Sequence, residues 1–278
     1  MATHADARFY QIAVLGSLLS YGVLRLDFGV SLGQITLILA TCLAAQYVCT
    51  SRWKLPHYDP RSALISGLSL SLLLRTGHPA LAVLAAVVTI LSKFLIRVDD
   101  RHIFNPTHFG LVVMMLLTDQ VWVSPGQCGS VAFFGFLLAC LGAIVVNLAA
   151  RSDVTYVFLG CYLAIVVGRA LWLGDPMSIA VHQLQSGGLV LFAFFMISDT
   201  KTTPDSRAGR AVFALLVALG ASYSQFSLYR PNGLLWSLVA CSVTVPAINR
   251  WLPDRRYTGA VSRDARTPID AGTPVTMT

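Results

Sequence analysis

Two polar segments contain the residues of this chain that are best suited to chemistry. Residues 93–110 read KFLIRVDDRHIFNPTHFG, and residues 196–209 read MISDTKTTPDSRAG. Each segment places charged, amide and hydroxyl side chains between long apolar runs. Ionisable groups within membrane segments are costly, and they commonly mark binding sites and ion pathways. We therefore expect a binding site where these two segments lie.

The first segment contains a helix-start signal at Asn105 and Pro106. Asparagine caps free backbone amides, and proline fits the first helical turn because its missing N–H costs nothing there. A helix that begins below the headgroups presents partial positive charge to an anion or to an electron-rich ring edge. Thr107 and His108 add donors beside the cap. Spacing alone favours the plainer interpretation, a well-capped helix that simply begins at the interface.

Basic residues also recur in the first segment. Lys93, Arg97 and Arg101 are spaced four residues apart, so they would share one face if a helix continued through them. Asp99 and Asp100 interrupt this face and could pair with the basic groups. The pattern is compatible with interfacial snorkelling and salt bridges. It is equally compatible with a cytoplasmic cradle for a phosphate or a carboxylate.

The second segment is unusually rich in hydrogen-bonding side chains, with six of the seven residues from 198 to 204 able to form such bonds. Asp199 could pair with Lys201, accept from threonine hydroxyls, or bind a cation or a ring N–H. Ending a helix needs only one or two such residues. We therefore favour a binding role for Asp199, Thr202 and Thr203.

Composition predicts an all-α, polytopic membrane protein. Hydrophobic residues make up 55% of the chain, charged residues make up 12%, and the mean hydropathy is +0.68. Soluble domains have about 25% charged residues. The apolar residues fall into ten runs of roughly 14–22 residues, the length scale of membrane helices, at about 9–25, 29–50, 62–75, 78–96, 105–118, 130–149, 153–173, 183–198, 211–228 and 231–252. We expect a ten-helix transmembrane domain over 1–252 and a polar, disordered tail over 253–278.

Several of these runs are shorter than the roughly 20 residues that a membrane helix needs. They are 62–75, 105–118 and 183–198, and the first and third open with Ser-Gly at residues 66–67 and 186–187. Run 105–118 begins Asn-Pro-Thr, and run 231–252 begins Pro-Asn-Gly with Asn232. Short spans at corresponding places in two halves indicate a binding site. Five spans per half would make such a repeat inverted across the membrane.

The basic residues support this topology. With ten spans and both termini in the cytoplasm, 16 of the 20 Lys and Arg residues lie on the cytoplasmic side. The outer side holds only Arg25, Arg75, Arg169 and Arg230. This bias is the one expected from the positive-inside rule in a bacterial-type inner membrane. The net charge of +7 is thereby explained, and no nucleic-acid partner is expected.

Other kinds of site are not indicated. The six cysteines are scattered without metal-ligand spacing, so no metal centre is expected. Most histidines lie near the ends of runs, which disfavours a haem held by two histidines. No catalytic triad, carboxylate pair or phosphate-binding glycine loop is recognisable, and we assign no catalytic residue.

Three stretches resemble one membrane-protein family. They are SKFLIRVDDRHIFNP at 92–106, FFMISDTKTTP at 194–204, and the run from RPNG at 230–233 to PAINR at 246–250. They are similar to NqrB of the sodium-pumping NADH:quinone oxidoreductase and to RnfD of the Rnf ferredoxin:NAD oxidoreductase, which are membrane subunits of these two complexes. The resemblance extends over about 58–250. The compact chain looks most like the single-gene members found in enediyne biosynthetic clusters.

The resemblance implies a flavoprotein that passes electrons between flavins and a quinone or a partner redox subunit. Family members attach FMN to a threonine in a D-x-x-[ST]-G-A-T loop, and some also bind riboflavin without a covalent bond. This chain has no S-G-A-T or T-G-A-T sequence, and the connection at 149–155 offers only Thr155. We therefore expect a non-covalent flavin, riboflavin or FMN, held by residues from the polar signatures: Lys93, Asn105, Thr107, Asp199, Thr202, Thr203 and Asn232.

The leading prediction is thus an integral-membrane electron-transfer subunit in the lipid bilayer, rather than a self-contained enzyme. A transporter or efflux component on the same scaffold, without a redox cofactor, is the alternative. The missing FMN attachment loop favours that alternative. A structural or assembly partner without its own ligand is a third interpretation.

Overall fold

The described part of the chain is almost entirely helical. The computed structural model describes residues 7–25, 29–98, 101–123 and 152–254. Its secondary structure confirms the all-α class. The expected span at 130–149 lies outside the described residues, as do Asp99, Asp100 and nearly all of the tail at 253–278.

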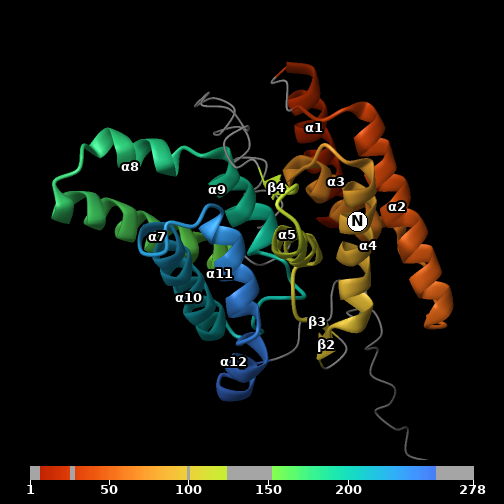
Figure 1. Cartoon of the computed structure of the whole chain (residues 1–278). Coiled ribbons are helices and arrows are strands. Elements are labelled where there is room, and N and C mark those ends of the chain that lie inside the picture. The colour runs from red at the N-terminus through yellow and green to blue at the C-terminus, as the bar shows by residue number, and fades with distance from the viewer. Residues whose placement is uncertain (1–6, 26–28, 99–100, 124–151, 255–278) are drawn as a thin grey trace, which may run out of the picture.

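The helices form two groups that lie on opposite sides of the molecule in Figure 1. The first group contains α1 (Ala7–Arg25), α2 (Leu32–Arg52), α3 (Pro60–Leu73), α4 (Pro79–Leu95) and α5 (Pro106–Leu117). The second contains α7 (Ser152–Leu173), α8 (Met177–Leu184), α9 (Gly187–Leu191), the π-helix η1 (Phe192–Met196), α10 (Arg207–Phe226), α11 (Gly233–Ser242) and α12 (Val245–Trp251). The groups meet where α5 packs against α11.

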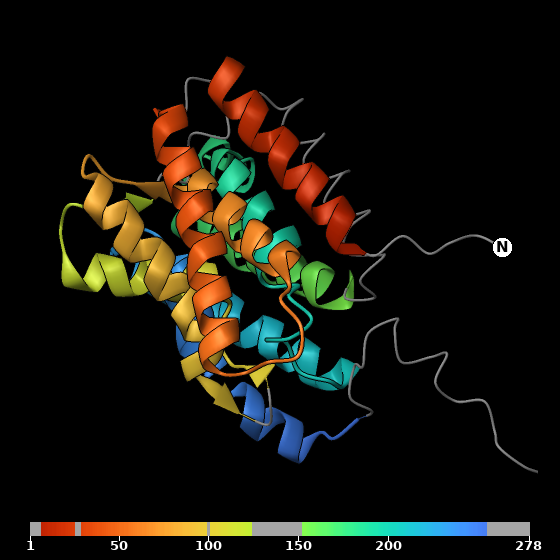
Figure 2. The ribbon, with the colours of Figure 1, turned by 90° about the vertical axis from the view of Figure 1, so that its right-hand side faces the viewer.

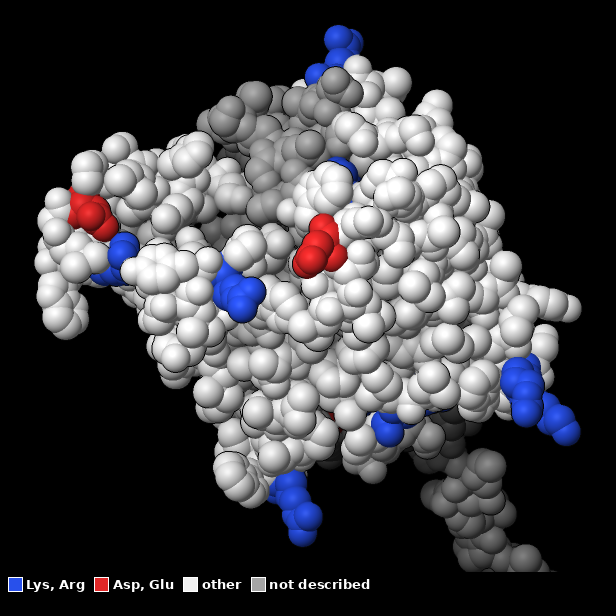
Figure 3. Space-filling model, viewed as in Figure 1, with Lys and Arg blue, Asp and Glu red and all other residues white. Residues whose placement is uncertain are grey.

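Within the first group, α1 and α2 both pack on α3, and α2 also packs on α4. Figure 2 shows α1 and α2 on the side of the molecule that faces the viewer there. In the second group, α10 packs between α7 and α11. Large apolar side chains such as Trp172 and Leu171 point outward and are largely exposed. Figure 3 shows only scattered charged side chains on the face viewed there, as expected for a surface that contacts lipid.

Among the described residues, two helices are long and apolar enough to cross a bilayer by themselves. They are α2 and α7, and a third span results if α8 is joined to the α9–η1 segment. The remaining apolar helices are shorter. The helices therefore fit a membrane protein with short segments, whereas the count of ten crossings stays a prediction.

Helices α3 and α5 stop well short of a bilayer's thickness. They contain 14 and 12 residues, which correspond to about 21 and 18 Å against about 30 Å of hydrocarbon. Beyond them the chain is extended, and β1 (Leu74–Arg75) pairs antiparallel with β4 (Trp122–Val123). Because lipid offers no hydrogen bonds, this pairing satisfies backbone groups where both helices have ended.

The run expected at 183–198 is broken. Helix α8 begins earlier, at Met177, and the chain bends by 46° before α9 and η1. The break falls at Gln185 and Ser186, immediately before two glycines. In η1 the amide of Ile197 donates to the carbonyl of Phe192 at 3.0 Å, which is the π-type spacing. Such turns are frequently found at functional sites.

No helix continues from Lys93 through Arg101, so the shared face that such a helix would give is not formed. Helix α4 ends at Leu95, and a hairpin of β2 (Arg97–Val98) and β3 (Arg101–His102) follows. Arg97 lies opposite His102, so Lys93, Arg97 and Arg101 do not share a helical face. The β-branched residues Ile96 and Val98 favour extended backbone, and Ile96 already has non-helical dihedral angles.

Two helix crossings depend on glycine. Gly110 of α5 lies directly against Thr89 of α4, and Gly220 of α10 lies against Ser237 of α11. The Ser237 hydroxyl donates to the carbonyl of Val217 at 2.7 Å across the second crossing. Small residues let membrane helices approach closely, so that van der Waals contact and hydrogen bonds hold them together.

Candidate functional site

The two polar segments meet at one end of the molecule. Asn105 caps α5 by accepting from the amide of His108 at 3.4 Å. Its side-chain Nδ2 lies 3.5 Å from the carbonyl of Met196, the last residue of η1. Arg101 of the hairpin forms an ion pair with Asp205 at 2.7 Å. Residues about one hundred positions apart in the sequence are therefore in direct contact.

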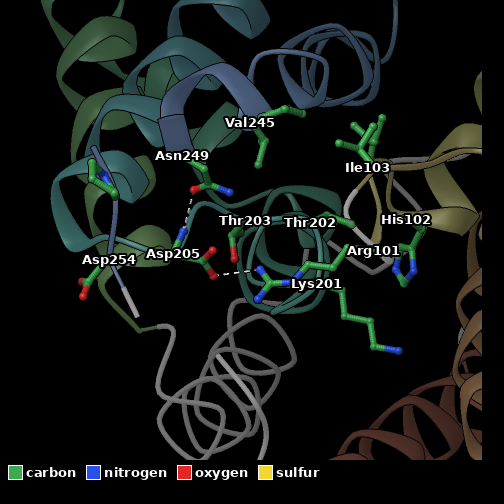
Figure 4. Close-up of a pocket in the computed structure, with 13 residues that line it drawn as sticks. Arg101, His102, Ile103, Lys201, Thr202, Thr203, Asp205, Val245, Asn249 and Asp254 are labelled. Carbon is green, nitrogen blue, oxygen red and sulfur yellow. Dashed lines mark hydrogen bonds and ion pairs between the residues drawn. The ribbon is translucent and has the colours of Figure 1, made fainter. Parts of the chain in front are cut away.

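A cleft lies at this junction (Figure 4). It has a volume of about 220 Å³ and is bounded by the hairpin, the loop after η1, and α12 with the residues that follow it. Asn249 of α12 accepts from the backbone amide of Asp205 at 2.9 Å, which fixes the loop against α12. The polar and charged residues that line the cleft are Arg101, His102, Lys201, Thr202, Thr203, Asp205, Asn249 and Asp254.

Two arginines hold the loop between η1 and α10. The Arg101–Asp205 pair is largely buried, with side-chain exposures of 21% and 9%. Arg210 of α10 donates to the backbone carbonyl of Asp205 at 2.6 Å and, through Nε, to Asp153 of α7 at 2.7 Å. Charge-assisted bonds of this kind are stronger than neutral ones. These bonds therefore attach the cleft wall to the hairpin, to α7 and to α10.

Asp199 is held as a carboxylate at the edge of this region. His102 Nε2 lies 3.8 Å from one of its oxygens, and the amide of Lys201 donates to the other at 3.0 Å. Burial acts to raise the pKa of Asp199, but His102 and Lys201 together outweigh burial and lower the pKa to about 2. Asp199 therefore carries its negative charge throughout the neutral range.

Thr202 and Thr203 line the cleft, although both are buried. Their hydroxyls donate to the carbonyl of Asp199, at 3.4 and 3.0 Å. Both threonines therefore also terminate the helical segment that ends before them. Part of the hydrogen-bonding capacity of this segment is used within the loop itself.

The other sequence-selected residues lie elsewhere. Lys93 is buried and donates to the carbonyl and the hydroxyl of Ser62, at 2.9 and 3.1 Å, which ties the end of α4 to the start of α3. The hydroxyl of Thr107 lies 3.4 Å from the carbonyl of Ser66. Asn232 begins α11 at the end remote from the cleft, where its Nδ2 lies 3.8 Å from the sulfur of Met115.

Sequence reasoning did not select four residues that build the cleft. Arg101 was noted only for its spacing, and His102 and Asp205 lie inside the two polar segments without having been singled out as ligands. Asn249 comes from α12, near the last part of the chain, and only the fold brings it to Asp205. For Asp205, the one available signal in the sequence was an acidic residue in the same loop as Asp199.

Short helices, a broken span and a polar cleft between two helical groups fit the class of integral membrane proteins. The chain belongs to the NQR2, RnfD, RnfE family, whose model matches residues 117–258, about half of the 278 residues. The resemblance noted in the sequence is thereby confirmed.

Named relatives agree with this assignment. The D subunit of a proton-translocating ferredoxin:NAD(+) oxidoreductase complex from Clostridium ljungdahlii is 23% identical over 78% of this chain and 80% of that protein. The D subunit of an ion-translocating oxidoreductase complex from Cronobacter sakazakii is 24% identical over 82% of this chain and 87% of that protein. The protein of the same description from Alcanivorax borkumensis is 33% identical, but the match spans only 31% of this chain and 26% of that relative.

Proposed function

We propose that this protein is a membrane subunit of an ion-translocating oxidoreductase complex, in which it binds a flavin non-covalently and passes electrons to a partner redox protein or a quinone. Family membership and the names of the relatives support the class of complex. The observation that carries the flavin proposal is the meeting of the two polar segments at one cleft.

The donor set of the cleft suits the polar end of a flavin. Arg101 and Lys201 supply positive charge, and Thr202, Thr203 and Asn249 supply hydrogen-bonding groups. The volume of about 220 Å³ is below the roughly 300–1,000 Å³ of complete cofactor pockets. The cleft thus fits a ribityl chain or a phosphate, with the ring extending beyond it. The bound flavin would supply the electron-carrying chemistry, which the side chains themselves lack.

Non-covalent binding is supported by the position of Thr155. This threonine is fully buried in α7, and its hydroxyl donates to the carbonyl of Ala193 at 2.8 Å. A phosphoester bond would need that hydroxyl to be free and accessible. Thr155 therefore serves the packing of α7 against η1 and does not suit attachment of FMN.

We also infer the inverted arrangement of two five-span halves, with both termini in the cytoplasm. Helix α2 packs on α4 as α7 packs on α10, and α4 packs on α5 as α10 packs on α11. Helix α5 begins near the cleft, whereas α11 leads toward it, so these two counterparts run in opposite directions (Figure 1). An inverted repeat requires this reversal.

The flavin proposal is tested by purifying the full chain in mild detergent, recording its visible absorbance, and titrating it with riboflavin and FMN. Arg101→Gln and Lys201→Gln should weaken FMN binding by about tenfold each, since a hydrogen bond to a charged group contributes roughly 1.5–3 kcal/mol. Arg169→Gln is the matched control, because Arg169 pairs with Asp175 at the far end of α7. A colourless protein that binds neither flavin contradicts the proposal.

Transport without a redox cofactor is the second candidate, favoured by the broken span at α8–α9 and by the short helices α3 and α5. Broken helices near the midplane also form the binding sites of transporters. Uptake of a substrate into proteoliposomes by a flavin-free preparation would decide for this candidate.

A further inference from the structure

His108 is a buried polar side chain whose position the flavin proposal leaves unexplained. It lies in the first turn of α5, three residues after the cap Asn105. The residue is fully buried, and neither ring nitrogen has a hydrogen-bond partner among the described residues. An unsatisfied buried polar group costs about 1–3 kcal/mol. A purely structural position would be occupied at lower cost by leucine or phenylalanine.

A second, independent feature lies beside this ring. The π-helix η1 runs along the same turn of α5, with its first residue, Phe192, in edge-to-face contact with His108 at a centroid distance of 5.9 Å. Its last residue, Met196, accepts from Asn105. The unsatisfied histidine therefore faces the one π-helical turn in the described part of the chain. Because π-turns often mark functional sites, the two observations indicate the same place.

A partly exposed carboxylate follows η1 in the chain. Asp199 lies three residues after η1, and its side chain is 24% exposed. His102, at 3.8 Å from Asp199, lines the cleft. Within the described residues, η1 contributes no ionisable group toward the ring, and Lys93 of α4 is bound to Ser62. Asp199 is the first carboxylate after η1, so it is the negative charge that this loop offers to a protonated ring.

We propose that His108 is the membrane-interior proton-binding residue of a proton pathway that enters beside the cleft at His102 and Asp199. A hydronium ion delivered through water gives a proton to the free nitrogen of the neutral ring. The ring then releases the proton from its other nitrogen to a second water molecule, so the imidazole returns to neutrality and one proton has moved inward. This pathway requires no flavin.

The test uses the full chain reconstituted into liposomes that contain a pH-sensitive dye, with a potassium diffusion potential as the driving force. His108→Leu and His108→Gln should each lower the protein-dependent proton flux by at least about tenfold, because neither residue titrates. Thr89→Val is the matched control and should keep the flux, since Thr89 is another buried, unpartnered side chain on the neighbouring helix. Asp199→Asn should lower the flux as well.

Folding is checked separately by thermal unfolding of each variant in detergent. His108→Gln keeps a polar side chain of similar size, so it distinguishes a titrating role from packing. Unchanged flux in well-folded His108→Gln, or a wild-type flux no higher than that of protein-free liposomes, overturns the proposal. Flavin content is measured on the same preparations. A flavin-free protein with a His108-dependent flux would contradict only the proposed function.

Discussion

Asp199 shows how one carboxylate is kept ionised at the edge of a membrane domain. Its two oxygens face the His102 ring and the Lys201 amide. These favourable interactions exceed the opposing effect of burial, and the pKa falls to about 2. The folded state thus binds the proton less tightly than the unfolded chain does.

This shift predicts a pH-dependent stability. Because the pKa of the folded state lies below the ordinary value of 3.8, the contribution of Asp199 is present above that value and is lost as the pH falls toward about 2. Asp199→Asn should lower the free energy of unfolding by roughly 2 kcal/mol near neutral pH, and the difference from wild type should shrink in acid. Thermal unfolding in detergent at several pH values measures this.

The exposed Asp119, at the far end of α5, provides the control for that series. Asp119→Asn should unfold like wild type at each pH, because no hydrogen bond or ion pair of its side chain is described. If the loss of stability in Asp199→Asn, relative to wild type, stays constant down to the lowest pH, the loss reflects packing rather than charge.

At the scale of elements, two close helix crossings determine how the short helices are held. Gly110 brings α5 against α4, and Gly220 brings α10 against α11. A Cβ at Gly110 would overlap the Thr89 hydroxyl, and one at Gly220 would lie 2.5 Å from the Ser237 hydroxyl. Both crossings belong to helices that border the contact between the two groups.

Gly110→Ala and Gly220→Ala should therefore each destabilise the protein by about 1–3 kcal/mol through overpacking. Gly16→Ala in α1 is the control, since a Cβ there meets nothing within 4 Å, and it should be neutral or slightly stabilising. Melting temperatures in detergent report the effect. Thr89→Ala should partly rescue Gly110→Ala, and the absence of any rescue would contradict a local clash.

At the scale of the whole molecule, chain connectivity assigns the loops to two opposite ends of the helical bundle, and hence to two sides of the membrane in the inferred topology. Lys54 follows α2, and the bond from Lys93 to Ser62 places the end of α4 beside the start of α3. The hairpin after α4 reaches the cleft, where Lys201 also lies. Gly77 and Tyr229 occupy connections at the other ends of α4 and α10.

Single cysteines test this arrangement in a background in which the six native cysteines are alanine. Lys54→Cys and Lys201→Cys should react with an impermeant maleimide only in inside-out vesicles, and Gly77→Cys and Tyr229→Cys only in intact spheroplasts. All four positions are exposed, so reactivity reports sidedness. Labelling of Lys54→Cys and Lys201→Cys from opposite sides would rule out the inferred topology.

The sequence by itself determined the class of the protein, the location of its polar segments and its family. Hydropathy along the chain reflects lipid exposure residue by residue, so long apolar runs and short ones can be identified without a structure. The helix start at Asn105 could also be predicted from neighbouring residues alone, because a cap and the following proline act on adjacent amides. The motifs at 92–106 and 194–204 were sufficient to identify the family, which the family match over 117–258 confirms.

Only the tertiary structure decided which residues meet. It ended α4 at Leu95, brought Asn249 to Asp205, and left Asn232 at the far end of α11. It also placed the unpartnered His108 against a π-helix more than eighty residues away in the chain. Contacts of this kind depend on how separate helices pack and where each one ends, and the local composition of a segment does not encode these properties.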